Sequence, residues 1–222
     1  MTNLELIIFD CDGVLVNSEP IVNRIFAETL TEGGLTITYE EVTQQFMGKS
    51  LATCLEIIKK TYGKPVPAKL LERCKEREIA ALQQELQATE GIAAVLEQIT
   101  LPRCVASNSS PRHIQFVLQL TGLLHQFDGK LYSSHHVERP KPFPDVYLYA
   151  ASQMGKTPEN CLVIEDSVTG VQAASAARMQ VFGYTPRSNQ GNSSHHDALI
   201  AAGAKLVFED MYQLPILLKL WK

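Results

Sequence analysis

Two aspartates stand one residue apart at the end of an apolar run near the start of the chain. Leu6 to Phe9 is typical of a buried strand in a parallel sheet, and Asp10, Asp12 and Gly13 follow it. The carboxyl end of such a strand is where open α/β sheets place their ligands. Because crowded carboxylates repel one another, they usually share a proton or a cation. The pattern therefore predicts a reactive, cation-binding site.

Two later apolar stretches also end in polar residues. Ser107 closes the first stretch, and Glu165 with Asp166 closes the second. Between them stands Lys141, with a proline on each side that restricts its backbone. Hydroxyl and carboxylate groups therefore stand at the ends of expected strands, and an ammonium group stands in a rigid turn between them.

The second half of the chain alternates between strand and helix patterns. This alternation predicts an α/β fold with a doubly wound, parallel, Rossmann-like sheet. After the first strand, the expected strands are 103–108, 129–133, 161–165, 180–184 and 205–208, and the expected helices are 91–99, 111–121, 145–154 and 167–178. A polar segment separates the last two strands. In this topology the strand ends gather Asp10, Ser107, Glu165 and Asp166 on one edge.

Residues 17–87 show helical periodicity and no strand pattern. Helices are expected over 19–32, 39–46, 51–62 and 67 to about 87. The predicted domains are therefore an α/β core of 1–16 and 88–222 and an inserted helical domain of 17–87.

The set of motifs resembles the haloacid dehalogenase superfamily in residue type, order and structural context. The residues that carry the resemblance are, in chain order, Asp10 with Asp12, Ser107, Lys141, and Glu165 with Asp166. The resemblance implies that the helical domain is a cap. Within the superfamily, the chain looks most similar to the sugar-phosphate phosphatases, including the 6-phosphogluconate phosphatases, and to the β-phosphoglucomutase-like branch. It implies a phosphoric monoester hydrolase acting on a small phosphorylated metabolite, a sugar phosphate or a sugar-acid phosphate.

The resemblance also implies catalytic roles. Asp10 would be the nucleophile that forms an aspartyl-phosphate, and Asp12 the general acid and later the general base. Ser107 would hydrogen-bond a phosphate oxygen, and Lys141 would screen negative charge. The peptide bond that follows Lys141 can be cis in this family.

Mg²⁺ is the implied cofactor, because it prefers a few oxygen ligands. Its ligands would be the carboxylates of Asp10 and Asp166 and the backbone carbonyl of Asp12, with Glu165 as a further or outer ligand. Substrate-binding candidates are the residues after Ser107 and the loop of the cap, namely Asn108, Ser109, Gly48 and Lys49.

Two other interpretations remain. The first is a phosphosugar mutase resembling β-phosphoglucomutase. Those enzymes carry a histidine twelve residues after the nucleophile, where this chain has Val22, which favours net hydrolysis. The second is a non-catalytic binding protein on the same fold, although a complete reactive set argues against it.

Composition excludes several classes of protein. With 222 residues, a net charge of −4 and no block of like charges, the chain is not expected to bind nucleic acid. Its apolar start is too short for a membrane span. Five cysteines without a Cys-x-x-Cys pair indicate free thiols and a cytoplasmic location. A monomer or weak homo-oligomer is expected, and the pairs His135–His136 and His195–His196 are expected in exposed loops.

Overall fold

The structure is a computed structural model that describes residues 4–46, 51–186 and 193–221. Its internal contacts divide the chain into two compact units. The first, here called the α/β unit, comprises Met1–Asn17 and Gln87–Lys222; the second, the helical unit, comprises Ser18–Leu86.

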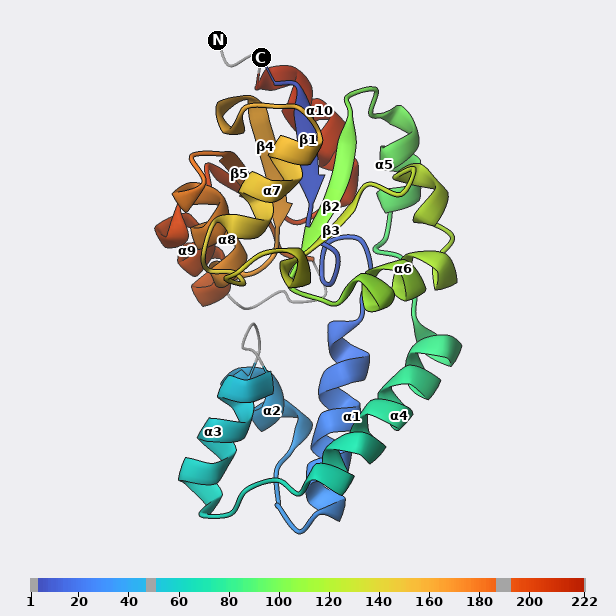
Figure 1. Cartoon of the computed structure of the whole chain (residues 1–222), viewed down its shortest axis with the longest axis vertical. Coiled ribbons are helices and arrows are strands. Elements are labelled where there is room, and N and C mark those ends of the chain that lie inside the picture. Colours follow the sequence, from blue (N-terminus) through green and yellow to red (C-terminus); the bar gives the residue numbers. More distant parts are fainter. Residues whose placement is uncertain (1–3, 47–50, 187–192, 222) are drawn as a thin grey trace. The chain divides into compact units, whose positions relative to one another are not determined.

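The α/β unit is built on a six-stranded sheet in which every strand is parallel to its neighbours. In spatial order, the strands are β3 (Leu131–Ser133), β2 (Arg103–Ser107), β1 (Leu6–Phe9), β4 (Cys161–Glu165), β5 (Gln180–Tyr184) and β6 (Leu206–Phe208). β1 and β4 are entirely buried, as their apolar runs predict, and they lie at the centre of the sheet. The carboxyl ends of the strands therefore meet at one edge, the lower edge of this unit in Figure 1.

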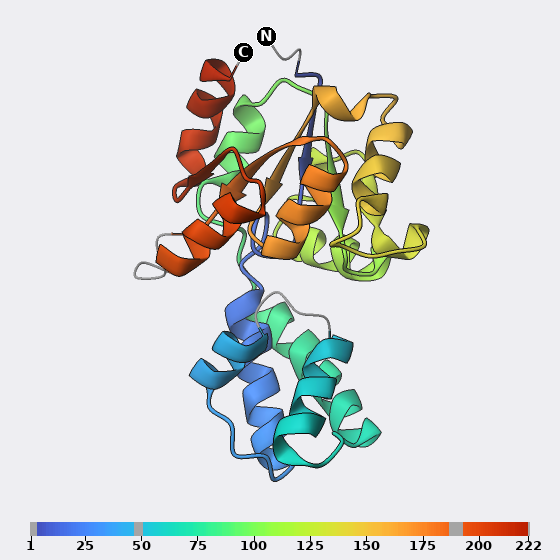
Figure 2. The same cartoon turned by 90° about the vertical axis from the view of Figure 1, so that its left-hand side faces the viewer.

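Helices cover both faces of this sheet (Figures 1 and 2). Those of the α/β unit are α5 (Ile92–Gln98), α6 (Pro111–Leu120), α7 (Asp145–Gln153), α8 (Val168–Ala176), α9 (Ser193–Ala202) and α10 (Leu214–Leu220). On one face, Ile8 and Val163 of the sheet share a buried core with Tyr147 of α7 and Leu199 of α9. Alternate strand residues such as Ile7 are also fully buried, so both faces are covered and the predicted α/β class is confirmed.

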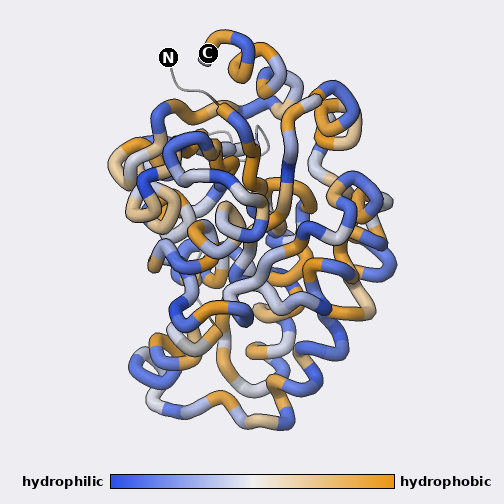
Figure 3. Tube along the Cα trace, turned by 45° about the horizontal axis from the view of Figure 1, so that its top comes forward, coloured by the Kyte–Doolittle hydropathy of each residue, from blue (hydrophilic) through white to orange (hydrophobic). Residues whose placement is uncertain are grey.

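The helical unit consists of α1 (Glu19–Glu32), α2 (Tyr39–Phe46), α3 (Leu51–Tyr62) and α4 (Ala68–Glu85). The rings of Phe26 and Phe46 pack edge to face inside it, with their centroids 5.8 Å apart. Outside this core, Arg77 of α4 binds Glu28 and Glu32 of α1. The alternation of hydrophobic and hydrophilic residues along these helices is visible in Figure 3.

Several elements differ from the sequence prediction. A polar segment was expected between β5 and β6, and the structure has the helix α9 there, which was not predicted; α10 was not predicted either. The strand expected over 129–133 begins only at Leu131, because Asp128 and Gly129 both have positive φ angles and form a turn. Of the helices that the structure describes, none has the length and apolar character needed to cross a membrane.

Candidate active site

The loop after β1 lies beside the end of β4, so the carboxylates of Asp10 and Asp166 are close together although they are far apart in the chain. Asp10 is buried, and its N–H donates to the carbonyl of Ile164 in β4 at 3.0 Å. Gly13 turns the chain away with a φ of +86°. A Cβ at Gly13 would lie only 2.0 Å from an oxygen of the Asp166 carboxylate, so a side chain there would displace that carboxylate.

Lys141 is the buried cation of the site. Its Nζ donates to Oδ1 of Asp10 at 2.6 Å, to Oε1 of Glu165 at 2.8 Å and to the carbonyl of Ala106 at 3.0 Å. All three N–H bonds of the ammonium thus have a partner. Its backbone N–H donates to Oδ1 of Asn108 at 2.9 Å, and the Lys141–Pro142 peptide bond is cis. The lysine is therefore held from both its backbone and its ammonium group.

Glu165 is completely buried and accepts hydrogen bonds at both oxygens. Oε1 accepts from Lys141 and from the hydroxyl of Tyr147, at 2.8 and 2.9 Å. Oε2 accepts from the backbone N–H and the hydroxyl of Ser167, at 2.8 and 2.9 Å. Gly170 makes room for this carboxylate, because a Cβ there would lie 1.6 Å from Oε1.

Burial and charge give these buried groups different pKa shifts. Burial raises the pKa of Asp10 to about 7, and the negative charges of Glu165 and Asp12 act in the same direction. The positive charge of Lys141 opposes this rise but does not cancel it. Burial also disfavours the charged form of Glu165, but Lys141 and the donors around it outweigh burial and lower its pKa. For Lys141 itself, burial would lower the pKa, but the two carboxylates outweigh it and raise the pKa. These shifts favour the charged forms of Lys141 and Glu165. The one positive charge near Asp10 does not offset the effect of burial on its carboxylate.

Among the described residues, Asp10, Glu165 and Asp166 can each place a carboxylate oxygen within 4.8 Å of the others. Hard oxygen donors at this spacing suit a divalent cation such as Mg²⁺ or Ca²⁺. The raised pKa of Asp10 fits the same interpretation, since a cation would supply the positive charge that one lysine cannot. The residues present therefore fit a divalent metal.

The turn after β2 presents hydroxyl and amide groups at the same edge of the sheet. Oγ of Ser107, which is buried, accepts from the backbone N–H of Ser109 at 3.0 Å. The hydroxyl of Ser133, at the end of β3, donates to the carbonyl of Ser109 at 2.6 Å. Ser110 then caps α6 by accepting from the N–H of His113. Local hydrogen bonds thus fix this turn before any ligand binds.

Asp12 is held at both carboxylate oxygens. The hydroxyl of Ser109 donates to Oδ2 at 2.8 Å, and Nε2 of His113 lies 3.1 Å from Oδ1. The side chains of Asp12 and His113 are each 25% exposed, so this pair lies at the border between protein and solvent.

The structure thus gathers Asp10, Asp12, Ser107, Lys141, Glu165 and Asp166 at the strand ends, together with Asn108 and Ser109. Sequence reasoning missed His113, Tyr147 and Ser133, which bind the groups that it did single out. One signal was available for His113. A serine followed by Pro111 is a helix start, and it places residue 113 in the first turn, beside the strand end.

Other predicted residues stand apart from this site. Gly48 and Lys49 lie outside the residues that the structure describes. The expectation that His195 and His196 lie in an exposed loop is wrong, because both belong to α9. His195 is only partly exposed, and its Nε2 lies 2.8 Å from the backbone carbonyl of Asp166.

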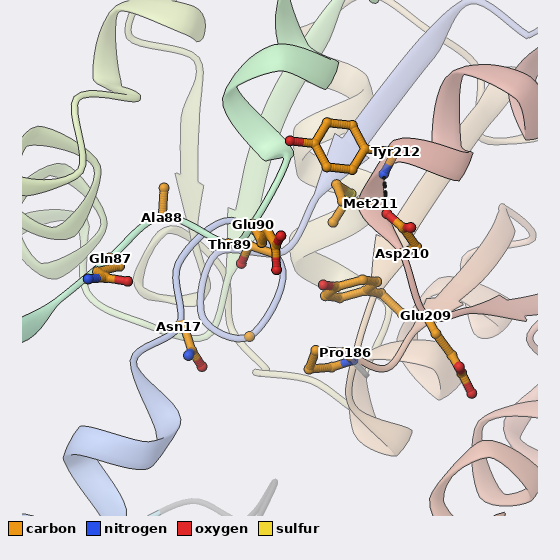
Figure 4. A pocket seen from close by; sticks show the side chains of 12 residues that line it. Asn17, Gln87, Ala88, Thr89, Glu90, Pro186, Glu209, Asp210, Met211 and Tyr212 are labelled. Carbon is orange, nitrogen blue, oxygen red and sulfur yellow. Dashed lines mark hydrogen bonds between the residues drawn. The ribbon is translucent and has the colours of Figure 1, made fainter. Parts of the chain in front are cut away.

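A cavity of about 390 Å³ lies beside this site within the α/β unit, and Gly13 forms part of its wall (Figure 4). Its wall includes the carboxylates of Glu90, Glu209 and Asp210, and none of its described lining residues is basic. Because an acidic wall repels a phosphate, this cavity does not suit the anionic part of a phosphorylated ligand. The hydroxyl, amide and ammonium groups that suit an anion lie outside it.

Comparisons with known proteins show which family the chain is similar to. A family model described as haloacid dehalogenase-like hydrolase matches residues 4–178. The chain is 34% identical over 223 residues to the 6-phosphogluconate phosphatase of Escherichia coli, an alignment that covers all of this chain and 96% of that protein.

Solved structures are also similar. A haloacid dehalogenase-like protein of unknown function from Agrobacterium tumefaciens is 36% identical, with a TM-score of 0.87 over 98% of this chain and 99% of that one. A hydrolase of the same family from Deinococcus radiodurans, solved with phosphate and sodium bound, is 31% identical. Its TM-score is 0.83, and the match covers 98% of this chain and 96% of that one.

Proposed function

We propose that this chain, which belongs to the haloacid dehalogenase-like hydrolase family, is a Mg²⁺-dependent phosphatase that hydrolyses a phosphorylated sugar or sugar acid through an aspartyl-phosphate. Membership rests on the family match over residues 4–178 and on a relative 34% identical along the whole chain. It confirms the predicted resemblance and the prediction of a phosphoric monoester hydrolase. The metal, the intermediate and the substrate are the parts that we propose.

The observation that carries the proposal is the buried contact between Lys141 and Asp10 at the end of β1. Even when paired with Lys141, a buried carboxylate has a desolvation cost that apolar residues would avoid, so its presence here indicates a function. Lys141 orients the carboxylate through Oδ1, which leaves Oδ2 as the candidate attacking atom. This arrangement suits a nucleophile more than a structural ion pair.

In the proposed reaction, an oxygen of Asp10 attacks phosphorus, and the bond between phosphorus and the leaving-group oxygen breaks. Asp12, protonated at this stage, donates its proton to the departing alkoxide. Water then attacks phosphorus in the aspartyl-phosphate and gives a proton to the Asp12 carboxylate. Phosphate leaves, and both Asp10 and Asp12 return to their starting forms.

Charge on the phosphate must be neutralised before a carboxylate can attack it. Lys141 supplies one positive charge close to Asp10. A bound Mg²⁺ would supply further positive charge to neutralise the phosphate. We propose Asp10, Asp166 and the backbone carbonyl of Asp12 as its ligands, with Glu165 behind them because its oxygens already accept four hydrogen bonds.

The turn over Ser107, Asn108 and Ser109 is proposed to bind the phosphate oxygens. It combines hydroxyl groups with backbone N–H groups, and α6 begins directly after it. The N-terminus of a helix carries a partial positive charge, which favours an anion at this point.

Substrate choice is assigned to the helical unit, Ser18–Leu86, as an expectation of the family resemblance. The whole-chain similarity to 6-phosphogluconate phosphatase supports a sugar or sugar-acid phosphate. Gly48 and Lys49 remain predicted contacts of the substrate's leaving group. The five buried, free cysteines support a location in the reducing cytoplasm, and a monomer or weak homo-oligomer stays the expected assembly.

A phosphate-release screen tests this function. The full chain is incubated with sugar phosphates, sugar-acid phosphates and polyol phosphates, in Mg²⁺ and in EDTA, and inorganic phosphate is measured. We expect release that depends on Mg²⁺ and is fastest for one of the sugar or sugar-acid substrates. Isomerised sugar phosphate without net release would identify a mutase, and no turnover of any substrate would contradict the proposal.

A further inference from the structure

The carboxylate of Asp12 is bound more completely than that of a side chain in an ordinary exposed turn. Each of its oxygens has its own partner, Ser109 at 2.8 Å and His113 at 3.1 Å. While Asp12 is ionised, its oxygens can only accept, so in that state Nε2 of His113 carries the hydrogen of this contact. Two donors on two different oxygens fix the plane of the carboxylate, which a single donor would leave free to rotate.

Both donors are themselves held in place. Ser109 donates its N–H to Ser107 and accepts at its carbonyl from Ser133. His113 stands in the first turn of α6, where its N–H donates to the capping Ser110 and Pro111 restricts the backbone. The next residue of the same helix, Ile114, is fully buried and anchors this turn in the core. The helix start thus holds the imidazole beside the end of β1.

We propose that His113 is a positioning residue for Asp12, and that together with Ser109 it aims the carboxyl group at the oxygen of the leaving group. This inference rests on the proposed function and adds a residue that neither the motifs nor the family match assigns. Orientation matters here because a proton donor acts only within hydrogen-bond distance of the atom that it protonates.

This role affects some substrates more than others. A sugar alkoxide is a strong base and needs a proton as it leaves, whereas p-nitrophenolate is stable without one. Formation of the aspartyl-phosphate, which kcat/KM reports, therefore needs a well-aimed Asp12 only for the sugar substrate. A residue that merely supports the fold would affect both substrates alike.

The experiment compares His113→Leu with the wild-type chain on p-nitrophenyl phosphate and on the best sugar phosphate from the phosphate-release screen. We expect kcat/KM to fall about 10- to 100-fold for the sugar phosphate and less than about threefold for p-nitrophenyl phosphate. His113→Gln, whose amide N–H reaches a similar position, should recover much of the loss. His125→Leu, an exposed histidine elsewhere in the unit, is the matched control and should change neither value.

A second variant covers the case in which His113→Leu does not fold. His113→Asn keeps a polar side chain but is too short to reach Asp12, so the same selective loss is expected from it. Equal losses on both substrates, or no loss on either, would overturn the role of His113 while leaving the phosphatase intact. A wild-type chain that hydrolyses neither substrate would instead contradict the proposed function itself.

Discussion

The two units of the molecule use charged residues in opposite ways. In the α/β unit, Asp10, Lys141 and Glu165 are buried, with exposed fractions of 8%, 7% and 0%. In the helical unit, the ion pairs between Arg77 of α4 and the glutamates of α1 have side chains that are 33–44% exposed. The charged side chains of the α/β site are shielded from solvent, whereas those of the helical unit remain in contact with it.

We interpret this difference as one between charge that serves the proposed chemistry and charge that serves packing. Burying a charge has a large desolvation cost, and apolar residues would stabilise the same volume as well or better. Exposed ion pairs cost little and contribute little. A buried charge network at the strand ends is therefore best explained by a reaction, whereas the network on α1 and α4 is explained by helix pairing.

The strongest test of this contrast is Asp10→Asn. The substitution keeps the size of the side chain but removes the proposed nucleophile, so we expect kcat to fall by at least about 10³-fold. Circular dichroism and thermal unfolding should show an intact fold. Near-normal turnover by the folded variant would exclude the aspartyl-phosphate.

Lys141→Met tests how much the buried ion pairs of Lys141 with Asp10 and Glu165 contribute to the stability of the fold. It leaves Glu165 and Asp10 buried without their cation, and we expect the free energy of unfolding to fall by about 3–5 kcal/mol. Urea unfolding at neutral pH measures this change. A loss of under about 1 kcal/mol would mean that the buried pair resembles an exposed one.

Asp166→Ala tests the metal site. Since it removes one anionic ligand, the Mg²⁺ concentration for half-maximal activity should rise about 10- to 100-fold. Titration with Mg²⁺ at saturating substrate gives this value. An unchanged half-saturation would place Asp166 outside the metal site.

The raised pKa of Asp10, about 7, predicts how metal binding depends on pH. Below this value the carboxyl binds a proton that Mg²⁺ must displace, so Mg²⁺ affinity should fall by up to about tenfold per pH unit as pH drops from 7 to 6. The rise in melting temperature on adding Mg²⁺, measured at pH 8, 7 and 6, reports this effect. In Asp10→Asn the pH dependence should largely disappear; if it persists, another group is responsible.

The smallest effect is expected from Arg77→Met, which removes a cation from the helical unit. Its partners Glu28 and Glu32 remain in water, so stability should fall by only about 0.2–1 kcal/mol. The same urea experiment as for Lys141→Met makes this the matched basic-to-methionine control. A loss as large as that of Lys141→Met would remove the contrast between the two units.

The strands and most helices were predictable because their patterns are local. β1 is a continuous apolar run, β4 is apolar up to its last residue, Glu165, and α1 carries its buried residues at helical spacing. α9 escaped prediction because it begins with serines and histidines and buries little more than Leu199. α10 is a short, mostly apolar segment without a clear polar face.

The site was predictable where side chains stand at a strand end, as Ser107 and Glu165 do, or directly after one, as Asp10 does. The partners that fix these side chains come from other elements: His113 is 101 residues from Asp12, and Tyr147 is 18 from Glu165. Such pairings depend on how helices pack against the sheet, and periodicity along one strand or helix does not contain that information.

Gly13 and Gly170 limit which changes the chain can accept. At each position a single added carbon would enter the space of a carboxylate, Asp166 in one case and Glu165 in the other. Neither glycine has a side chain that could react, yet a larger residue at either position would displace a carboxylate. Random mutagenesis of this enzyme should therefore find two intolerant positions that carry no functional group, and a search for new activities has more room in the exposed residues of the helical unit.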